Sequence, residues 1–143
     1  MRAQKSLSLL FVLTGLCAGG SACRTRVKHD LPAAGAVGFE LPGNGAVAHG
    51  ALLTQPPGRE EPFVPYVAVG ATAWVAACRA EAGSTPPLFS FETDANGALR
   101  AAAADSGATP RDRCLAAHAA TGAAPAGLPA QTRVTVQLAL RAP

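Results

Sequence analysis

Apolar residues change their spacing several times along the chain, and each spacing predicts a different element. In the middle of the chain they recur at steps of three, four and seven, as on one face of a helix: Val67, Ala71, Trp74, Val75, Cys78 and Ala82. We expect this helix to end at Gly83, a residue type common just past a helix C-terminus. Gly70 disfavours a helix near its start, so the alternative prediction is that residues 64–69 are extended. In either conformation Trp74 and Cys78 share a face, and Trp74 is expected to anchor the core.

A β-hairpin is predicted next. Residues 88–93 place Phe89 and Phe91 on one side and polar residues on the other, and residues 98–103 return along them. The connection contains Asn96-Gly97, and both residue types accept the positive φ that a type I′ turn requires. This hairpin is the clearest local signal in the chain.

A second helix and a final strand complete the carboxy-terminal part. Thr109 is suited to the N-cap, Pro110 to the first helical position and Asp112 to the first turn. The helix is expected to run from Pro110 to about Thr121 and to end at Gly122. Beyond it, apolar residues alternate with polar or small ones, as in a half-buried strand: Val134, Val136, Leu138 and Leu140.

The order helix, strand, strand, helix, strand predicts an α+β domain over residues 66–143, with a small antiparallel sheet packed against two helices. Residues 23–65 are rich in loops. Within them, Val37, Phe39 and Leu41 could form one strand of a hairpin, and Val47 with Leu53 part of the other, across the turn Pro42-Gly43-Asn44-Gly45. Prolines mark residues 55–65 as a linker, in which Glu60 and Glu61 are expected to be solvated.

Residues 1–22 have the order of a secretory signal peptide. Arg2 and Lys5 precede an apolar run over 7–16, and small residues follow it. The run covers about ten residues, whereas a membrane-spanning helix needs about 20. We therefore expect cleavage between Ala22 and Cys23 and export of the remainder.

Gly20-Ser21-Ala22-Cys23 resembles the lipobox of bacterial lipoproteins, in which the cysteine becomes the acylated amino terminus. Families with this box usually have an aliphatic residue where this chain has Gly20. The resemblance implies a fatty-acyl (palmitate-type) membrane anchor on Cys23 and a location in the cell envelope, facing the periplasm or the exterior. Ordinary secretion after the same cut, with Cys23 as a free or paired thiol, remains the alternative.

The charge balance excludes a basic nucleic-acid-binding domain. The chain has 12 Lys and Arg against 9 Asp and Glu, and loss of Arg2 and Lys5 with the signal leaves 10 against 9. Only Arg24, Arg26 and Lys28 cluster, directly after the proposed anchor, whereas nucleic-acid binding requires basic residues grouped on one face. The chain is also rich in alanine, glycine and proline, so many apolar positions bury little area.

Export and acylation would leave Cys78 and Cys114 as the remaining pair, and an oxidising compartment permits a disulfide between them. The two cysteines are 36 residues apart. Closing a loop of that size by a disulfide stabilises the folded protein by about 3–4 kcal/mol in the chain-entropy model. The competing interpretation is two independent buried thiols.

Candidate catalytic or ligand-binding chemistry is sparse. Of the three histidines, His118 lies four residues after Cys114 and could share a metal-binding helix face with it, an option that a disulfide would remove. Otherwise we expect His118 to have no functional role. The chain contains no nucleophile-elbow or phosphate-loop motif. We therefore expect no catalytic residues, metal or cofactor, and a protein that is not an enzyme.

The carboxy-terminal half resembles the TonB-like carboxy-terminal domain, in particular the AgmX/PglI type of bacterial envelope proteins. The resemblance rests on the order of five features: Cys78, Phe89-Ser90-Phe91, Asp94-Ala95-Asn96-Gly97, Cys114 and Val134-Thr135-Val136. It implies the α-β-β-α-β fold and one cysteine in each helix. Departures are Arg79 where the family often has an aromatic residue, and Thr121-Gly122-Ala123 where it often has Trp or Phe.

These features predict a lipid-anchored envelope protein that acts as a non-catalytic protein-interaction module. Its partner would be another envelope protein, bound by strand addition at a free sheet edge. Our candidate for that edge is the strand with Val134, Val136 and Leu138, whose simplest role is nevertheless a core strand. The alternative function is a structural or accessory secreted protein without a peptide partner.

Overall fold

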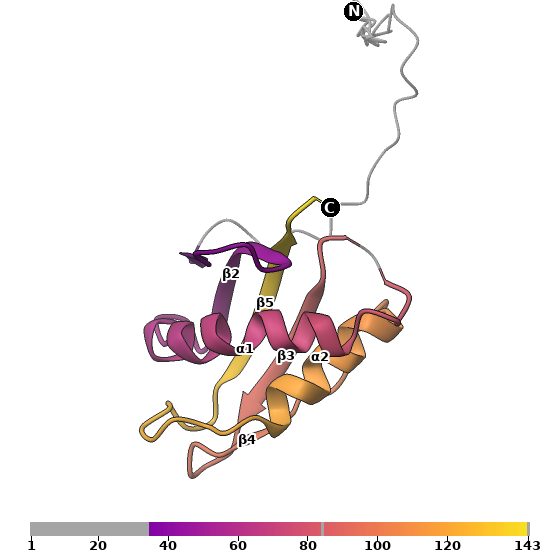
Figure 1. The fold of residues 1–143 in the computed structure, drawn as a ribbon. Helices are drawn as coiled ribbons and strands as arrows, with labels where there is room; N and C mark the ends of the chain where they lie inside the picture. Colours follow the sequence, from indigo (N-terminus) through magenta and orange to yellow (C-terminus); the bar gives the residue numbers. More distant parts are fainter. Residues whose placement is uncertain (1–34, 84, 143) are drawn as a thin grey trace, which may run out of the picture.

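The computed structural model describes residues 35–83 and 85–142. The predicted signal peptide and Cys23 lie outside the described residues. The fold is α+β, as predicted, with a five-stranded antiparallel sheet and two α-helices (Figure 1). Its elements in chain order are β1 (Val37–Glu40), β2 (Val47–Gln55), a 3-10 turn (Glu61–Phe63), α1 (Val64–Ala77), β3 (Leu88–Thr93), β4 (Leu99–Ala101), α2 (Pro110–Thr121) and β5 (Arg133–Leu140).

The sheet has the order β1-β2-β5-β3-β4, which puts the last strand of the chain at its centre. β5 pairs with β2 along one side and with β3 along the other. The prediction of an edge role for Val134, Val136 and Leu138 is therefore wrong, and the simpler core-strand interpretation is correct. The free edges belong to β1 and β4.

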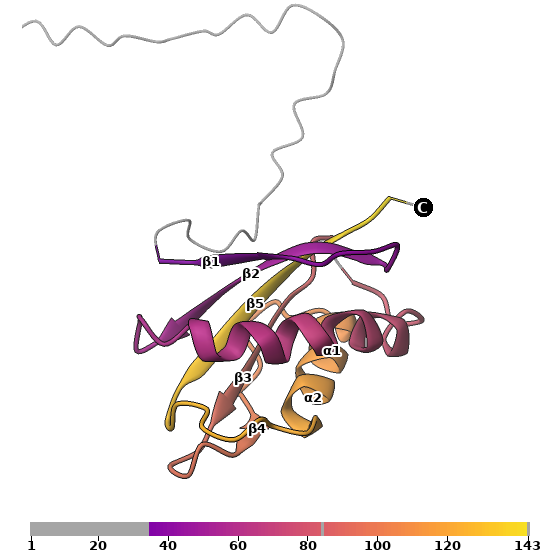
Figure 2. The same cartoon turned by 60° about the vertical axis from the view of Figure 1, so that its left-hand side comes forward.

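Both helices lie on the same side of the sheet, so the protein has two layers (Figure 2). The strand register aligns Leu52, Val136 and Phe89 across the three central strands, and all three side chains are buried. Val67 of α1 and Leu115 of α2 are fully buried above them. One apolar layer between the sheet and the helices thus forms the core.

The first helix is shifted toward the amino terminus relative to the prediction. α1 begins at Val64, so the alternative of an extended segment over 64–69 is wrong, because Pro65 in the first turn is compatible with a helix start. It ends at Ala77, well before Gly83. The following residues turn toward α2, where the Ala82 carbonyl accepts a hydrogen bond from the Arg111 amide. That bond satisfies one of the unpaired amides at the start of α2.

The two predicted hairpins are present, with one difference in the turn between β3 and β4. Only Gly97 has a positive φ there, so the turn is not type I′. The Asp94 carboxylate accepts hydrogen bonds from the amides of Asn96 and Ala98, at 2.8 and 3.0 Å, and holds Asn96 in the ordinary φ range. β4 is also shorter than predicted and ends at Ala101.

Helix α2 has the predicted boundaries, Pro110 and Thr121. The Thr109 hydroxyl accepts a hydrogen bond from the Asp112 amide at 3.2 Å, and the Asp112 carboxylate accepts one from the Thr109 amide at 3.0 Å. This reciprocal capping box sets the helix start. Asp112 also accepts a hydrogen bond from the Leu88 amide at 3.1 Å, which ties α2 to the beginning of β3.

Candidate functional site

A disulfide joins the two helices, as predicted. Cys78 caps the end of α1 and Cys114 lies in the second turn of α2, with their Cα atoms 5.8 Å apart. Cys78 is fully buried, whereas Cys114 is half-buried. The bridge therefore closes one end of the helical layer, and its Cys114 side faces the surface.

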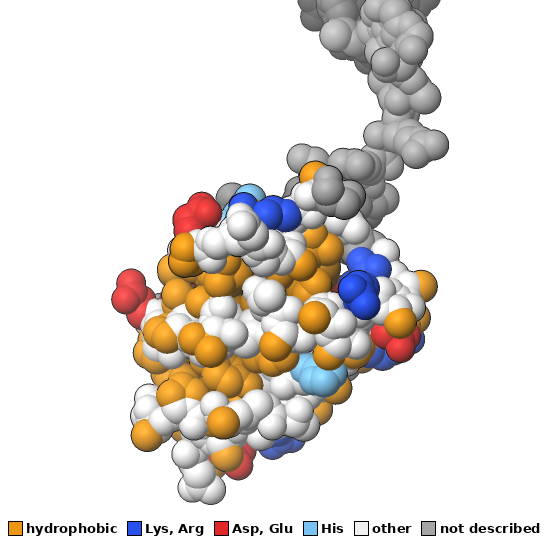
Figure 3. Space-filling view, in the orientation of Figure 1, with side chains coloured by type: hydrophobic (Ala, Val, Ile, Leu, Met, Phe, Trp, Pro, Cys, Tyr) orange, Lys and Arg blue, Asp and Glu red, His pale blue; other side chains and the backbone are white. Residues whose placement is uncertain are grey.

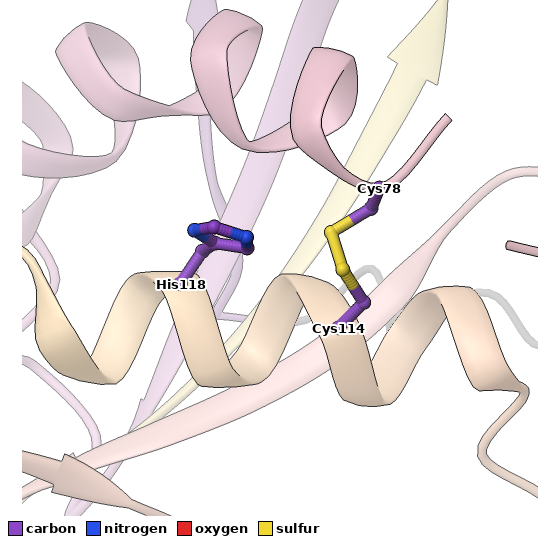
Figure 4. A group of neighbouring side chains, drawn as sticks. All are labelled: Cys78, Cys114 and His118. Atoms are coloured by element: carbon purple, nitrogen blue, oxygen red, sulfur yellow. A yellow bond between two sulfur atoms is a disulfide. The ribbon is translucent and has the colours of Figure 1, made fainter. Parts of the chain in front are cut away.

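His118 lies one helical turn beyond Cys114, and its ring stands in the gap between the two helices on the side of the disulfide (Figure 4). A ring nitrogen of His118 and the two Sγ atoms lie within 4.8 Å of one another. This is the only group of three such ligands in the described part of the chain. With the sulfurs bonded to each other, neither is a thiolate that could bind a metal.

The other histidines take no part in this group. His49 is exposed on β2, and His29 lies outside the described residues. The spacing of Cys114 and His118 in sequence was the signal that pointed to this site. The third member, Cys78, was placed beside them only by the packing of α1 on α2.

An apolar groove lies on the outer side of α1, next to the end of α2. It has a volume of about 460 Å³, and its walls are formed by Pro65, Tyr66, Val69, Gly70, Trp74 and residues 122–125. Val69 is 85% exposed, and among the described residues it is the one large hydrophobic residue that is exposed rather than buried or half-buried. The groove is thus an apolar hollow bordered by the solvent-exposed side chain of Val69.

Close contact between Trp74 and Gly70 shapes this groove. A Cβ atom at position 70 would lie 2.2 Å from Cζ2 of the indole. The ring therefore lies directly over the glycine backbone, where it is 7% exposed. The glycine that weakens the helix in sequence terms is the residue that allows Trp74 to pack against α1.

Tyr66 connects the groove to α2. Its hydroxyl donates a hydrogen bond to the Ala119 carbonyl at 2.5 Å, and its ring packs against Trp74 with the centroids 5.4 Å apart. Burial raises the pKa of Tyr66, and a backbone hydrogen bond from Gly122 offsets only part of that effect. The hydroxyl is therefore a neutral donor at physiological pH, and it serves to position the groove wall.

The whole exposed face of α1 is uncharged. Its solvent-facing residues are Pro65, Val69, Thr72, Ala73, Ala76 and Ala77. In the orientation of Figure 1, hydrophobic and neutral side chains fill the middle of the molecular face, and charged side chains lie around its rim (Figure 3). A helix that is apolar on every side is typical of a buried position, yet α1 covers the sheet from outside.

A second hollow, of about 220 Å³, lies between α2 and the β4 edge and is lined mainly by alanines. Its main polar group, Asp105, is already engaged by Arg133 at 2.8 Å and by the Ser90 hydroxyl at 3.3 Å. No buried side-chain nitrogen or oxygen of the described residues lacks a hydrogen-bond partner. The hollow therefore offers a ligand no buried side-chain polar group that lacks a partner.

Glu60 is buried, contrary to the prediction of a solvated loop. It is 6% exposed, and its Oε1 accepts hydrogen bonds from the Thr54 hydroxyl at 2.9 Å and from the amides of Gly58 and Thr54 at 3.1 and 3.3 Å. Burial alone would raise the pKa of Glu60, but these hydrogen bonds and one from its own amide together lower it. Its role is to close the loop between β2 and α1.

The two free sheet edges are poorly suited to strand addition. β1 has four residues and β4 has three. Short edge strands are one way in which proteins avoid pairing with other chains. The apolar face of α1 is therefore the better candidate for contact with a partner.

Comparisons with known protein families, with characterised proteins and with solved structures find no match to this chain. Among the described residues, neither α1 nor α2 is both long and apolar enough to cross a membrane. The geometry thus presents two candidate sites, the disulfide with His118 and the groove on α1.

Proposed function

We propose that this chain is a lipid-anchored protein of the bacterial cell envelope that binds another protein through the uncharged face of α1. The observation that carries the proposal is Val69, which is 85% exposed and lines an apolar groove together with Trp74. Large exposed apolar patches on soluble proteins mark interaction sites or ligand-binding grooves. The Cys78–Cys114 disulfide supports a location outside the reducing cytosol.

The chemistry of the face indicates the kind of partner. The exposed side of α1 has no charged residue. Charged groups on a partner would therefore lose their hydration at this surface without gaining an opposite charge. A bulky aliphatic or aromatic side chain would fit a groove formed by Tyr66, Trp74 and Pro125. The partner segment is therefore apolar, with one large side chain as its anchor.

We further propose that the domain is related to the TonB-like carboxy-terminal domain. The order α1-β3-β4-α2-β5 and the bridge between Cys78 and Cys114 support it. The β1-β2 hairpin is an addition at the β5 side of that unit. With β2 covering β5, a partner strand would have to pair with β1 or β4, which makes the α1 face the favoured surface.

Crosslinking in the exporting cell tests the interaction. A photoreactive side chain at position 69 should capture one envelope protein, and the same group at exposed position 117 of α2 should not. Val69→Glu should abolish co-purification of that protein, whereas Ala117→Glu should preserve it. Capture of a second copy of this chain would identify a homodimer instead, and no specific capture at position 69 would favour the accessory role without a peptide partner.

Fatty-acid labelling tests the anchor. The wild-type chain should incorporate labelled palmitate, Cys23→Ala should not, and Cys17→Ala should be labelled like the wild type. Equal labelling of the wild type and Cys23→Ala would refute acylation at Cys23 and leave ordinary secretion.

A further inference from the structure

We propose that reduction of the Cys78–Cys114 disulfide converts this position into a zinc site, with Cys78 Sγ, Cys114 Sγ and a ring nitrogen of His118 as protein ligands. Thiolate sulfur and imidazole nitrogen are the ligands that Zn²⁺ prefers in proteins. The three ligand atoms already lie within 4.8 Å of one another. The inference is independent of the proposed partner-binding function.

The backbone geometry suits such a site. Cys114 and His118 are four residues apart on α2 and so project from the same side of the helix. In tetrahedral zinc coordination with Zn–S bonds of about 2.3 Å, the two sulfurs lie about 3.8 Å apart. Once the S–S bond is broken, side-chain rotation can provide this separation, because the Cα atoms are 5.8 Å apart and need not move far.

The surroundings leave the imidazole available. His118 is exposed, and among the described residues its ring makes no hydrogen bond or ion pair. The uncharged side of α1 faces it, so no nearby carboxylate of that helix competes for a cation. Cys78 is fully buried and holds the site on the core side, and the surface side leaves a fourth position for water.

The reduction that opens the site is ordinary thiol–disulfide exchange. The thiolate of an external dithiol attacks the accessible Cys114 Sγ, the S–S bond breaks, and Cys78 leaves as the thiolate. The second thiol of the dithiol then displaces Cys114 and forms its own disulfide, so that two electrons and two protons pass to the protein. Zinc binding afterwards keeps both cysteines as thiolates and releases their protons.

Metal titration of the full chain tests this inference, with Cys17→Ser and Cys23→Ser present in all samples so that Cys78 and Cys114 are the only thiols. The protein is reduced with a phosphine, which does not compete for zinc as a dithiol would, and is then titrated anaerobically with Co²⁺. The reduced form should bind about one Co²⁺ per chain, with thiolate-to-cobalt charge-transfer bands that Zn²⁺ abolishes. The oxidised form should show no such bands.

Two histidine variants define the outcome. Loss of a residue that only hydrogen-bonds to a metal ligand costs about 10–100-fold in metal affinity. Loss of a ligand itself should cost more, so we expect His118→Ala to weaken Co²⁺ binding by at least about 100-fold. His49→Ala, which removes an exposed histidine elsewhere, should bind as the parent does. Equal binding by His118→Ala and the parent would overturn the assignment.

Circular dichroism covers the case in which the reduced protein loses its fold. Zn²⁺ should then restore the folded spectrum of the parent but not of His118→Ala, because the site does not exist in the unfolded chain and metal binding therefore drives folding. Absence of both charge-transfer bands and any zinc effect on the fold would refute the proposal, whether or not the reduced chain is folded.

Discussion

The indole of Trp74 lies on the backbone of Gly70, one turn earlier in α1, so closely that a Cβ at position 70 would be 2.2 Å from the ring. The tryptophan is buried by this contact and by Phe89 of β3, whose ring centroid lies 6.2 Å from that of the indole. Gly70 and Trp74 also line the groove that Val69 borders. One glycine therefore determines both a core contact and the shape of the proposed binding surface.

Gly70→Ala should destabilise the protein despite the better helix propensity of alanine. The propensity gain is about 1 kcal/mol, but overpacking costs about 1–3 kcal/mol and the ring loses part of its burial. We expect a net loss of about 1–2 kcal/mol in urea unfolding, with a red shift in the fluorescence of Trp74, the single tryptophan of the chain. Thr72→Ala, on the exposed side of the same helix, should leave the emission unchanged. Greater stability of Gly70→Ala with unaltered emission would contradict the contact.

Loss of the disulfide should lower the free energy of unfolding by about 3–4 kcal/mol, because the unfolded chain regains the entropy of a loop spanning 36 residues. The Cys78→Ser/Cys114→Ser variant, compared with the oxidised parent by urea unfolding, measures this difference. A change below about 1 kcal/mol would show that the bridge does not constrain the unfolded chain as this model requires.

Glu60 should make stability sensitive to acid. Its pKa is lower in the folded protein than in the unfolded chain, so its stabilising contribution is complete above the unfolded pKa of about 4.3 and is lost as the pH falls through the folded value. Glu60→Gln should cost about 1–2 kcal/mol at neutral pH and flatten the acid limb of the stability curve. Glu61→Gln, at the exposed neighbouring position, is the matched control and should reproduce the wild-type curve.

Thr109→Ala removes half of the capping box of α2 and should destabilise by about 1 kcal/mol. Thermal unfolding measures the effect. Thr121→Ala changes the same residue type at the opposite, exposed end of α2, where the hydroxyl bonds only to carbonyls of its own helix. A smaller effect at position 109 than at position 121 would mean that the cap does not limit the stability of this helix.

Local chemistry made much of the fold predictable. Thr109, Pro110 and Asp112 set the start of α2 through bonds within one turn, and the alternation around Phe89 and Phe91 marked β3. These signals depend on neighbours a few residues away, so they can be read in the sequence. The boundaries of α1 were less predictable, because its end is set by the turn toward α2.

Local patterns in the sequence were enough to predict most helices and strands, and to place Cys114 within a helix and Cys78 at the end of another. Which elements lie next to each other depends on long-range packing and could not be predicted from these patterns. Alternation in β5 is the same for an edge strand and a central strand when one sheet face is covered, so its central place follows from long-range pairing with β2 and β3. Three other features have the same cause: the burial of Glu60, the packing of Trp74 on Gly70 and the proximity of Cys78 to His118. Each is a contact created by packing, and no local pattern encodes it.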